Sequence, residues 1–475
     1  MKKISELFNY KLLLFIQGII SFVFLYFLCS VNVIPWFYVC ILVGIICMAN
    51  IVLCFGNKTN NILTKIISII FCVLLIIAVG YMDKSITTLV EVTEVNDEIN
   101  RVSVVVKKDS DYQEIQDLEN KIIQVNTTYN VAAMGATMNQ LNELVSCNYS
   151  SEDDFVKMAT NLYNEDVDAI LVNEAYLWVM EHKYESFKED TRIIWTYEYK
   201  KEKEDIKKPV VVDNECFNIF ISGIDTEGDV STVSRSDVNM LVTVNMATNQ
   251  ILLTSIPRDY YVYVSELKAK DKLTHAGLMG INSSVSTLED LMNIDINYYA
   301  RVNFTSLIMM VDSLGGIDVD VPYTVGRPGW SSYAPKGMNH MNGEKALAYS
   351  RERYDLPNGD EDRIKNQQRV IQGMLNKLIS PAIITNYMDI LDSVAGSFET
   401  NMSSKEITDL LKNQLKTMKS WDVQSYSLTG TGSYFKGGAM MPDTELYYCI
   451  PNEQSIQKAT DYINQMMDGE IIKVE

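Results

Sequence analysis

The chain has 475 residues, a formal net charge of −20 at pH 7 and 47% hydrophobic residues. A chain of this length accommodates roughly two or three domains. The acidic balance argues against nonspecific binding of nucleic acid, which depends on an excess of Lys and Arg. Any anion that the protein binds must therefore be held by a local basic cluster that works against the overall charge.

Three nearly continuous apolar runs fill the N-terminal part of the chain. They are residues 12–33, 36–55 and 62–81. Each run is close to the ~20 residues that a membrane-spanning helix needs, whereas a cleaved signal peptide would need only one run. Lys2, Lys3 and Lys11 precede the first run, and no basic residue separates it from the second. The positive-inside rule then predicts a multi-pass anchor, residues 1–83, in the cell membrane, with a cytoplasmic N-terminus and everything after Asp83 outside.

Residues 84–209 are predicted to form a small α/β accessory domain. Short strands are expected at 102–106, 122–125 and 169–172, and helices at 131–145 and 154–163. His182 stands alone on a predicted helix, and a lone His is more often structural or solvated than catalytic. The charged run that begins at Lys200 and is closed by Pro209 indicates a linker to the next domain.

The charges in the stretch 217–259 fall where predicted strands end. A strand at 217–221 is followed by Asp225, a polar loop then carries Asp237, and a hairpin pattern leads to Arg258. Because alternate side chains of a strand enter the core, the charges at the strand ends share one edge of a sheet. Carboxylates and guanidiniums gathered there suggest a site for a metal ion and phosphate. A set of surface ion pairs is the alternative interpretation of the same pattern.

Two helix starts are predicted further along the chain. Ser286, with Glu289 three residues later, has the pattern of a capping box. Asn303 precedes an amphipathic pattern that the pair Gly315-Gly316 ends. A strand with its aspartates on the solvent face is expected to follow at 317–321.

A second group of charges lies between residues 351 and 367. Arg351 and Arg353 point the same way if their segment is extended. A longer helix is predicted at 362–379, and Arg363 and Gln367 project from one face of it because they are four residues apart. A helix start favours anions through its dipole, which adds to the positive charge of the arginines.

Six short motifs in one order carry a specific resemblance. They are Gly223-Ile224-Asp225, Arg235-Ser236-Asp237, Ser255-Ile256-Pro257-Arg258-Asp259, Val311-Asp312-Ser313-Leu314-Gly315-Gly316, Ser350-Arg351-Glu352-Arg353 and Asn366-Gln367-Gln368-Arg369. On these motifs, residues 217–379 resemble the catalytic domain of the LytR-CpsA-Psr (LCP) family, and the resemblance continues more weakly to the C-terminus. The three spans and the accessory domain resemble capsule-associated members, with 210–475 as the catalytic domain. Thr274-His275 departs from the Asn-Ala that many members carry after the position of Lys272.

The resemblance implies an α/β fold with a central sheet flanked by helices, and an apolar tunnel for a prenyl chain. The implied activity is transfer of a glycopolymer from a polyprenyl-diphosphate carrier to peptidoglycan outside the membrane, with capsular polysaccharide favoured and teichoic acid or another wall glycan left open. By match of position, Asp225 and Asp237 would hold Mg2+. The diphosphate would be surrounded by Arg258, Arg351, Arg353, Arg363 and Gln367. Lys272 and Asp360 are further candidates, for which a solvated loop charge is an equal alternative.

The chemistry of phosphoryl transfer agrees with this assignment. It is catalysed mainly by positioning and by neutralising charge, and the planar fork of Arg binds phosphate oxygens bidentately while staying charged. The sequence has no P-loop, HExxH or GxSxG motif. We therefore expect direct attack by a sugar hydroxyl on the phosphorus nearer the glycan, with undecaprenyl phosphate leaving. The predicted catalytic residues are Asp237, Arg258, Arg351 and Arg353. Asp237 is the candidate general base, in competition with its role as a metal ligand; Arg235 is expected to brace Asp237, and Asp259 either orients Arg258 or acts on substrate.

Three other functions are alternatives to the transferase. A non-enzymatic membrane regulator would bind lipid-linked glycan and signal to capsule-assembly proteins through the bilayer, although the sequence predicts no sizeable cytoplasmic domain. A diphosphatase that releases the polymer into water is a nearby variant of the transferase. A DNA-binding regulator, a role historically attached to some relatives, conflicts with the external topology, the negative charge and the lack of a helix-turn-helix pattern.

Overall fold

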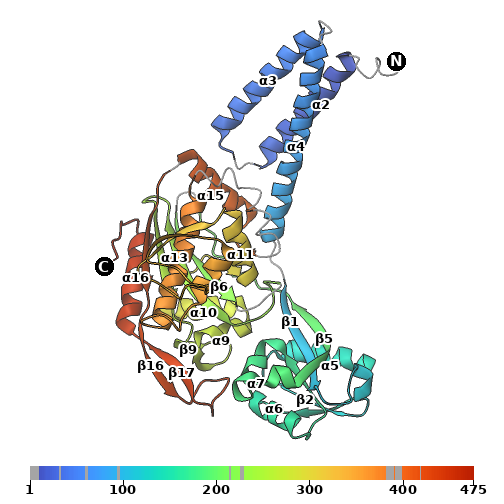
Figure 1. Cartoon of the computed structure of the whole chain (residues 1–475), viewed down its shortest axis with the longest axis vertical. Coiled ribbons are helices and arrows are strands. Elements are labelled where there is room, and N and C mark those ends of the chain that lie inside the picture. The colour runs from blue at the N-terminus through green and yellow to red at the C-terminus, as the bar shows by residue number, and fades with distance from the viewer. Residues whose placement is uncertain are drawn as a thin grey trace.

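Figure 1 shows the computed structural model of the chain, in which three long helices project from two α/β regions. The structure describes residues 10–31, 34–58, 62–93, 97–212, 215–224, 229–380, 390, 398–417 and 419–474. The smaller α/β region is built on a five-stranded sheet and the larger one on a six-stranded sheet. This architecture confirms the predicted α/β fold class with three apolar helices at the N-terminus.

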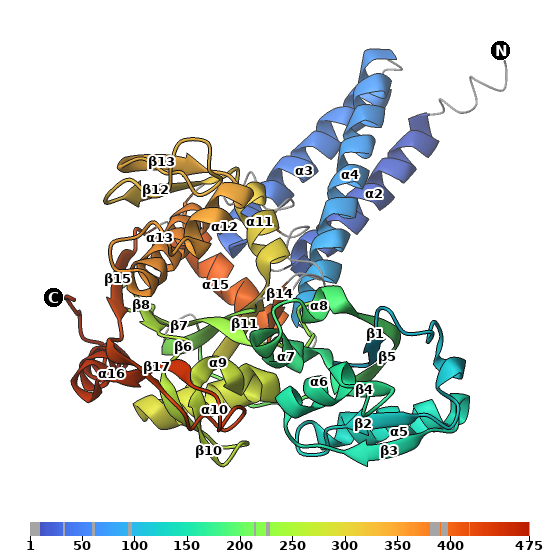
Figure 2. The ribbon, with the colours of Figure 1, turned by 60° about the horizontal axis from the view of Figure 1, so that its bottom comes forward.

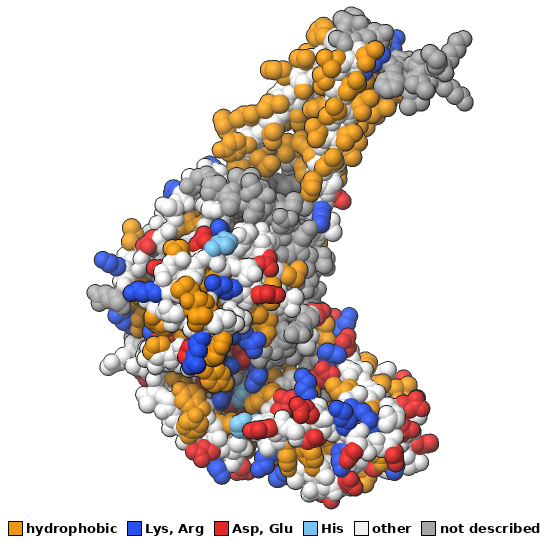
Figure 3. All heavy atoms as spheres, viewed as in Figure 1, with side chains coloured by type: hydrophobic (Ala, Val, Ile, Leu, Met, Phe, Trp, Pro, Cys, Tyr) orange, Lys and Arg blue, Asp and Glu red, His pale blue; other side chains and the backbone are white. Residues whose placement is uncertain are grey.

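The projecting helices are α2 (Tyr10–Val31), α3 (Trp36–Lys58) and α4 (Ile62–Thr93). All three are long and apolar enough to cross a membrane. Apolar side chains cover their outer surface in Figure 3, as expected of helices that face lipid. Between α2 and α3, Gln17 Nε2 donates to Asn50 Oδ1 at 2.7 Å, the kind of polar contact that holds helices together in a bilayer.

The end of α4 extends beyond the predicted third span and packs against the larger α/β region. Thr93 Oγ1 and Ser404 Oγ lie 2.6 Å apart, and Ser404 Oγ donates to the carbonyl of Leu89 at 3.1 Å. Leu89 itself is buried. The helix continues because its second half buries a face against another region, which the apolar run of the first half does not reveal.

The smaller region has the strand order β3-β2-β4-β1-β5. Its strands are β1 (Glu98–Lys107), β2 (Ile122–Val125), β3 (Asn148–Ser151), β4 (Ala169–Asn173) and β5 (Thr191–Lys201). Its helices are α5 (Val131–Leu144), α6 (Phe155–Tyr163), α7 (Leu177–Lys183) and α8 (Phe187–Asp190), with 3-10 turns η1 (Ile115–Leu118) and η2 (Glu174–Tyr176). The sequence pattern did not predict β3 and β5, because β3 has no apolar alternation and β5 is only partly buried.

The larger region has the strand order β14-β11-β6-β7-β8-β15. The strands are β6 (Cys216–Ile224), β7 (Ser236–Asn245), β8 (Gln250–Ile256), β11 (Tyr298–Val302), β14 (Phe398–Thr400) and β15 (Asp422–Ser427). β6 pairs in parallel with β11 and β8 pairs in parallel with β15, whereas β7 is antiparallel to both β6 and β8. The carboxyl ends of β6, β8, β11 and β15 therefore lie at one edge of the sheet, where β7 begins.

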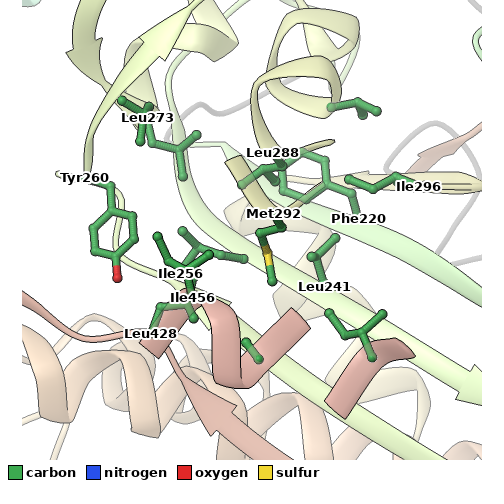
Figure 4. Packing of buried hydrophobic residues seen from close by; sticks show 14 of the residues in the cluster. Phe220, Leu241, Ile256, Tyr260, Leu273, Leu288, Met292, Ile296, Leu428 and Ile456 are labelled. Atoms are coloured by element: carbon green, nitrogen blue, oxygen red, sulfur yellow. The ribbon is translucent and has the colours of Figure 1, made fainter. Parts of the chain in front are cut away.

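Helices and hairpins surround this sheet. The helices are α9 (Leu273–Ala276), α10 (Ile281–Met292), α11 (Phe304–Ser313), α12 (Gly343–Arg351), α13 (Asp360–Leu378), α15 (Ser404–Thr417) and α16 (Glu453–Met467), with the 3-10 turn η3 (Gly277–Met279). The two-stranded sheets are β9 (Tyr261–Val264) with β10 (Ala269–Lys272), β12 (Ile317–Val321) with β13 (Gly337–Met341), and β16 (Gly430–Phe435) with β17 (Leu446–Pro451). Figure 4 shows one core of the region, in which Phe220 and Leu241 from the sheet pack with Leu288 of α10 and Ile456 of α16.

One predicted helix start is correct and the other is wrong. Asn303 caps α11, since its Oδ1 accepts a hydrogen bond from the Ser306 N–H at 2.9 Å. The predicted capping box at Ser286 is wrong because α10 already begins at Ile281, after Gly280 with φ 101°. The Ser286 hydroxyl lies inside the helix and donates to the Ser283 carbonyl at 3.2 Å.

The two α/β regions are docked on each other (Figure 2). Ile99 of β1 exchanges backbone hydrogen bonds of 3.0 Å with Ser231 and Val233, in the loop before β7. One apolar cluster contains side chains from both regions, among them Phe155, Tyr176 and Met180 with Leu278, Met440 and Tyr448. The charged segment between the regions is fixed as well, because Lys203 Nζ lies 2.5 Å from Glu399 Oε1 with both side chains almost fully buried.

Candidate functional site

A cavity of about 450 Å³ lies at the edge of the six-stranded sheet where the parallel strands end. The ends of β6, β7 and β11 bound it on one side, and α11, α12 and α13 bound it on the other. The crevice outside the carboxyl ends of such strands is the usual place for a ligand site in open α/β sheets. Gly223 lets β6 and β7 approach closely here, since a Cβ at this position would lie 2.7 Å from the Cβ of Val238.

Two kinds of side chain line this space, which we call the guanidinium cavity. The charged and amide side chains are Arg235, Asp237, Arg258, Asn303, Arg351, Arg353, Arg363 and Gln367. The apolar side chains are Ile224, Val238, Val302, Phe304, Leu307, Leu347, Val370 and Ile371. The cavity therefore sets concentrated positive charge beside an apolar wall, in a chain whose net charge is −20.

Asp237 and Arg258 form an ion pair at this cavity. Arg258 Nη1 lies 2.8 Å from Asp237 Oδ2, and Thr274 Oγ1 donates to Asp237 Oδ1 at 3.0 Å. Burial raises the pKa of the Asp237 carboxyl, but the charges of Arg258, Arg235 and Arg363 and the hydrogen bond from Thr274 together lower it by more, so its pKa lies below the ordinary value. Asp237 is therefore a carboxylate at neutral pH.

Arg258 and Arg363 hold buried donors that the described residues do not satisfy. Arg363 Nη2 pairs with Asp360 Oδ1 at 2.6 Å, and Arg258 Nε lies 3.6 Å from Asp259 Oδ2. Burial and the like charge of Arg258 lower the pKa of Arg363. The Nε atoms of both arginines have no hydrogen-bond partner within the described part of the chain. Since buried donors are normally paired, this pattern favours an anion in the cavity.

Arg351, Arg353 and Gln367 complete the polar wall. The guanidinium carbon of Arg351 lies 4.1 Å from the ring centroid of Phe304, and that of Arg353 lies 4.7 Å from the ring of Tyr354. Stacking of this kind holds a guanidinium flat and leaves its edge for an anion. Arg351 is the last residue of α12, not part of the extended segment predicted for it, yet both arginines reach the same cavity.

A family comparison identifies the fold that carries this cavity. The model of the LytR_cpsA_psr family matches residues 176–464, which is more than half of the chain. The chain belongs to the LytR_cpsA_psr family. The matched segment includes every strand of the six-stranded sheet and every described residue of the guanidinium cavity.

The names of curated relatives of this LytR_cpsA_psr protein describe a teichoic acid transferase and a biofilm regulator. Polyisoprenyl-teichoic acid–peptidoglycan teichoic acid transferase TagU of Enterococcus faecalis is 35% identical over 265 residues, which is 55% of this chain and 83% of the relative. Biofilm regulatory protein A of Streptococcus mutans is 33% identical over 250 residues, 49% of this chain but only 61% of the relative. A solved structure named TagT bound to LIIa-WTA is 26% identical, with a TM-score of 0.45 over 55% of this chain and 94% of that one.

One of the two predicted Mg2+ ligands of this LytR_cpsA_psr site can be placed. Asp225 lies outside the described residues, and among those described there is no group of three or more His, Cys, Asp or Glu side chains that could hold a metal. Each oxygen of Asp237 takes part in one hydrogen bond and so keeps a lone pair. Mg2+ is commonly held by one or two carboxylates with substrate phosphates and water. Asp237 therefore fits as one ligand of a magnesium ion that a phosphate would help to bind.

Lys272 is absent from the described lining of the guanidinium cavity. Its Nζ lies 2.8 Å from Asp259 Oδ1 and 5.5 Å from the ring centroid of Tyr448. Asp259 in turn faces Arg258, as one of its two predicted roles requires. Lys272 thus neutralises the carboxylate that faces Arg258, and its predicted contact with the diphosphate stays a prediction.

Arg235 lines the cavity, although the sequence predicted only that it braces Asp237. Its guanidinium carbon lies 4.9 Å from the ring centroid of Trp178, which belongs to α7 of the smaller region. The Trp178 ring lies 4.9 Å from the ring of His275, and His275 Nδ1 is 2.9 Å from Asp271 Oδ1. No local pattern could have linked Trp178 to this site, because the contact depends on how the two regions dock.

Proposed function

We propose that the protein transfers a glycopolymer from a polyprenyl-diphosphate lipid to peptidoglycan. The observation that carries the proposal is the guanidinium cavity, where arginines from several segments meet an apolar wall. A diphosphate needs several charged donors, and a prenyl chain needs apolar surface, so one lipid-linked substrate accounts for both. Relatives named as transferases of teichoic acid to peptidoglycan support the reaction class.

The proposed reaction is a direct displacement at phosphorus. The oxygen of an acceptor hydroxyl forms a bond to the phosphorus nearer the glycan, the bond from that phosphorus to the bridging oxygen breaks, and polyprenyl phosphate leaves. Arg258, Arg363 and their neighbours neutralise the charge that moves onto the leaving phosphate. The described lining contains no Cys, His or Lys, and Ser350 Oγ donates to the Leu347 carbonyl at 2.8 Å, so no covalent intermediate on the protein is invoked.

Asp237 serves as a fixed negative charge in this proposal. A carboxyl with a lowered pKa is a weak base, so we assign Asp237 to holding Mg2+ and orienting Arg258 instead of abstracting the proton. Mg2+ bound there would supply positive charge to the phosphate oxygens. Because the transition state of phosphoryl transfer is loose, the attacking hydroxyl needs no strong base and its proton is released to water.

We place the reaction at the outer face of the cell membrane and favour capsular polysaccharide as the polymer. The three apolar helices support attachment to a bilayer, and the charge distribution at their ends supports the outward orientation. The names of the TagU relatives make wall teichoic acid the alternative polymer. The name of the Streptococcus mutans relative fits a second role, a regulator that binds the same lipid without transferring its glycan.

Loss of single guanidiniums tests the proposal. The full chain in lipid nanodiscs, supplied with Mg2+ and a polyprenyl-diphosphate glycan, should attach the glycan to peptidoglycan fragments. Arg258→Ala and Arg351→Ala should each lower the transfer rate by about 10²- to 10³-fold, because each removes charge stabilisation from the leaving phosphate. Arg327→Ala is the matched control, since Arg327 is exposed and absent from the lining of the guanidinium cavity.

The products separate the competing functions. Free glycan phosphate in place of peptidoglycan-linked glycan would indicate a diphosphatase. Tight lipid binding with no turnover by the wild type would indicate the regulator. Wild-type rates in both the Arg258 and the Arg351 variants, with unchanged thermal unfolding, would refute the assigned site.

A further inference from the structure

A second cavity, of about 480 Å³, lies on the opposite side of α13 from the guanidinium cavity. It is bounded by α13, by the carboxyl ends of β8 and β15, and by the β16–β17 hairpin. We call it the polar cavity. The two cavities have no described lining residue in common, so α13 and the segment that follows β8 separate them.

The sequence of α13 builds a wall with two different faces. The face toward the guanidinium cavity carries Arg363, Gln367, Val370 and Ile371. The face toward the polar cavity carries Glu361, Ile364, Lys365, Gln368 and Gln372. Each set follows the three- and four-residue spacing of one helix face, which explains how a single helix serves both spaces.

Two ion pairs join the two sides of this wall, with the arginine on one side and the aspartate on the other. Arg258 lines the guanidinium cavity, while Asp259, whose Oδ2 is 3.6 Å from Arg258 Nε, lines the polar cavity. Arg363 and Asp360, paired at 2.6 Å, are divided in the same way. A phosphorus held by the two arginines would therefore lie one ion pair away from the polar cavity.

The lining of the polar cavity has the chemistry that recognises sugars. Its carboxylate, amide and hydroxyl groups come from Asp259, Asp360, Glu361, Gln368, Gln372, Ser425, Ser427 and Thr429. Tyr447, 37% exposed, adds an aromatic ring. Such groups pair with sugar hydroxyls, and a tyrosine ring packs on the apolar face of a sugar. Two of its carboxylates are already paired, Asp259 with Lys272 and Asp360 with Arg363. The described lining carries two basic side chains beside three carboxylates, whereas that of the guanidinium cavity carries five arginines beside one carboxylate, so a diphosphate favours the guanidinium cavity.

We propose that the polar cavity binds the acceptor saccharide, a glycan strand of peptidoglycan, an inference that rests on the proposed function. In a displacement at phosphorus the attacking and leaving oxygens are roughly in line. The leaving polyprenyl phosphate requires the apolar wall, which belongs to the guanidinium cavity. The acceptor hydroxyl therefore approaches the phosphorus from the other side, and the Arg258–Asp259 and Arg363–Asp360 pairs that separate the two cavities must part to admit it.

Binding measurements test this site without relying on turnover. The probes are a soluble, uncross-linked peptidoglycan tetrasaccharide and the polyprenyl-diphosphate glycan, titrated calorimetrically into the full chain in nanodiscs. Tyr447→Ala and Gln372→Ala should each raise the Kd for the tetrasaccharide about tenfold, the equivalent of about 1.4 kcal/mol, and leave the Kd for the lipid unchanged. Tyr263→Ala is the control, since Tyr263 is 52% exposed and absent from the described lining of either cavity.

The outcomes separate the inference from the proposed function. Tetrasaccharide binding that weakens only in the two lining variants supports the site, even if the wild type transfers nothing and the proposed function fails. No tetrasaccharide binding by the wild type overturns the inference, as does equal binding by all variants. Weaker binding of the lipid in place of the tetrasaccharide also overturns it, because the cavity would then hold the donor glycan.

Discussion

At the five-stranded sheet a cluster of buried amides around Asn100 is hydrogen-bonded within itself, whereas at the edge of the six-stranded sheet arginines surround a cavity. Asn100 Oδ1 accepts hydrogen bonds from Asn130 Nδ2 and Asn173 Nδ2, both at 2.9 Å. At the edge of the larger sheet, by contrast, the Nε atoms of Arg258 and Arg363 lack partners among the described residues. Arg192 of the smaller region also has an Nε atom without a partner among the described residues, but its Nη atoms donate to three backbone carbonyls and so stabilise the fold. The arginines of the larger region instead line a cavity that can hold a ligand.

The smaller region nevertheless contacts a residue that lines the guanidinium cavity of the larger region. Trp178 stacks on Arg235, and Arg235 is one of the charges that lower the pKa of Asp237. Ile99 pairs with the loop that leads to Arg235. Docking of the smaller region is therefore expected to hold one wall of the guanidinium cavity in place.

The largest effect is expected from matched changes at one carboxylate in each sheet. Asp237→Asn should lower the transfer rate by about 10²- to 10³-fold, because it removes the charge that faces Arg258 and the proposed Mg2+. Asp168 is the counterpart in the smaller region, where it accepts hydrogen bonds from Tyr112 Oη at 2.5 Å and the Ile122 N–H at 2.8 Å. Asp168→Asn should leave transfer unchanged and cost about 1 kcal/mol of stability in denaturant unfolding. Equal losses of transfer in Asp237→Asn and Asp168→Asn would contradict the assignment of the reaction to the larger region alone.

A smaller effect is expected at the contact between the regions. Trp178→Ala should lower kcat/KM about tenfold, since losing a partly desolvated cation–π contact frees Arg235. Trp178→Phe keeps an aromatic face for Arg235 and should therefore restore most of the rate. If Trp178 only filled space in the fold, the rate would not depend on an aromatic ring at this position. Trp195→Ala, which changes a tryptophan packed within the smaller region, is the control and should leave kcat/KM unchanged. An unaltered rate in Trp178→Ala would show that docking does not position the site.

The smallest effect is a change in the acid limb of the pH–rate profile. The folded pKa of Asp237 is depressed, so the carboxylate and its ion pair persist above that pKa and are lost as the pH falls through it. Arg235→Gln removes one of the lowering charges, so the pKa of Asp237 should rise and the acid limb should begin at higher pH than in the wild type. Profiles normalised to their own maxima isolate this change from any loss of rate. An acid limb at the same pH in Arg235→Gln and in the wild type would show that Arg235 does not lower the pKa of Asp237.

Patterns in the sequence predicted the parts of the fold and site that depend on local order. Strand ends and helix spacing located Asp237, Arg258 and Arg363 where the structure brings them to one cavity. The cap at Asn303 was equally local, since donor and acceptor lie three residues apart. The predicted metal role of Asp225 stays a prediction, because Asp225 lies outside the described residues.

Features that depend on long-range packing were not predictable in this way. The Trp178–Arg235 contact requires the docking of two regions, and the extension of α4 to Thr93 requires a partner surface. The start of α10 was misplaced because Gly280 and its positive φ, not the Ser286 pattern, set the first turn. The polar cavity was missed for a similar reason, since its lining comes from α13, β15 and the β16–β17 hairpin.

The unbroken course of α4 determines how far the reaction centre stands from the lipid. Its 32 residues span roughly 48 Å, whereas the hydrocarbon core of a bilayer is about 30 Å thick. The far end of the helix is hydrogen-bonded to Ser404, so α4 is held directly against the larger region. On the proposed function, this contact would keep the guanidinium cavity at a set distance from the membrane in which the lipid-linked substrate lies.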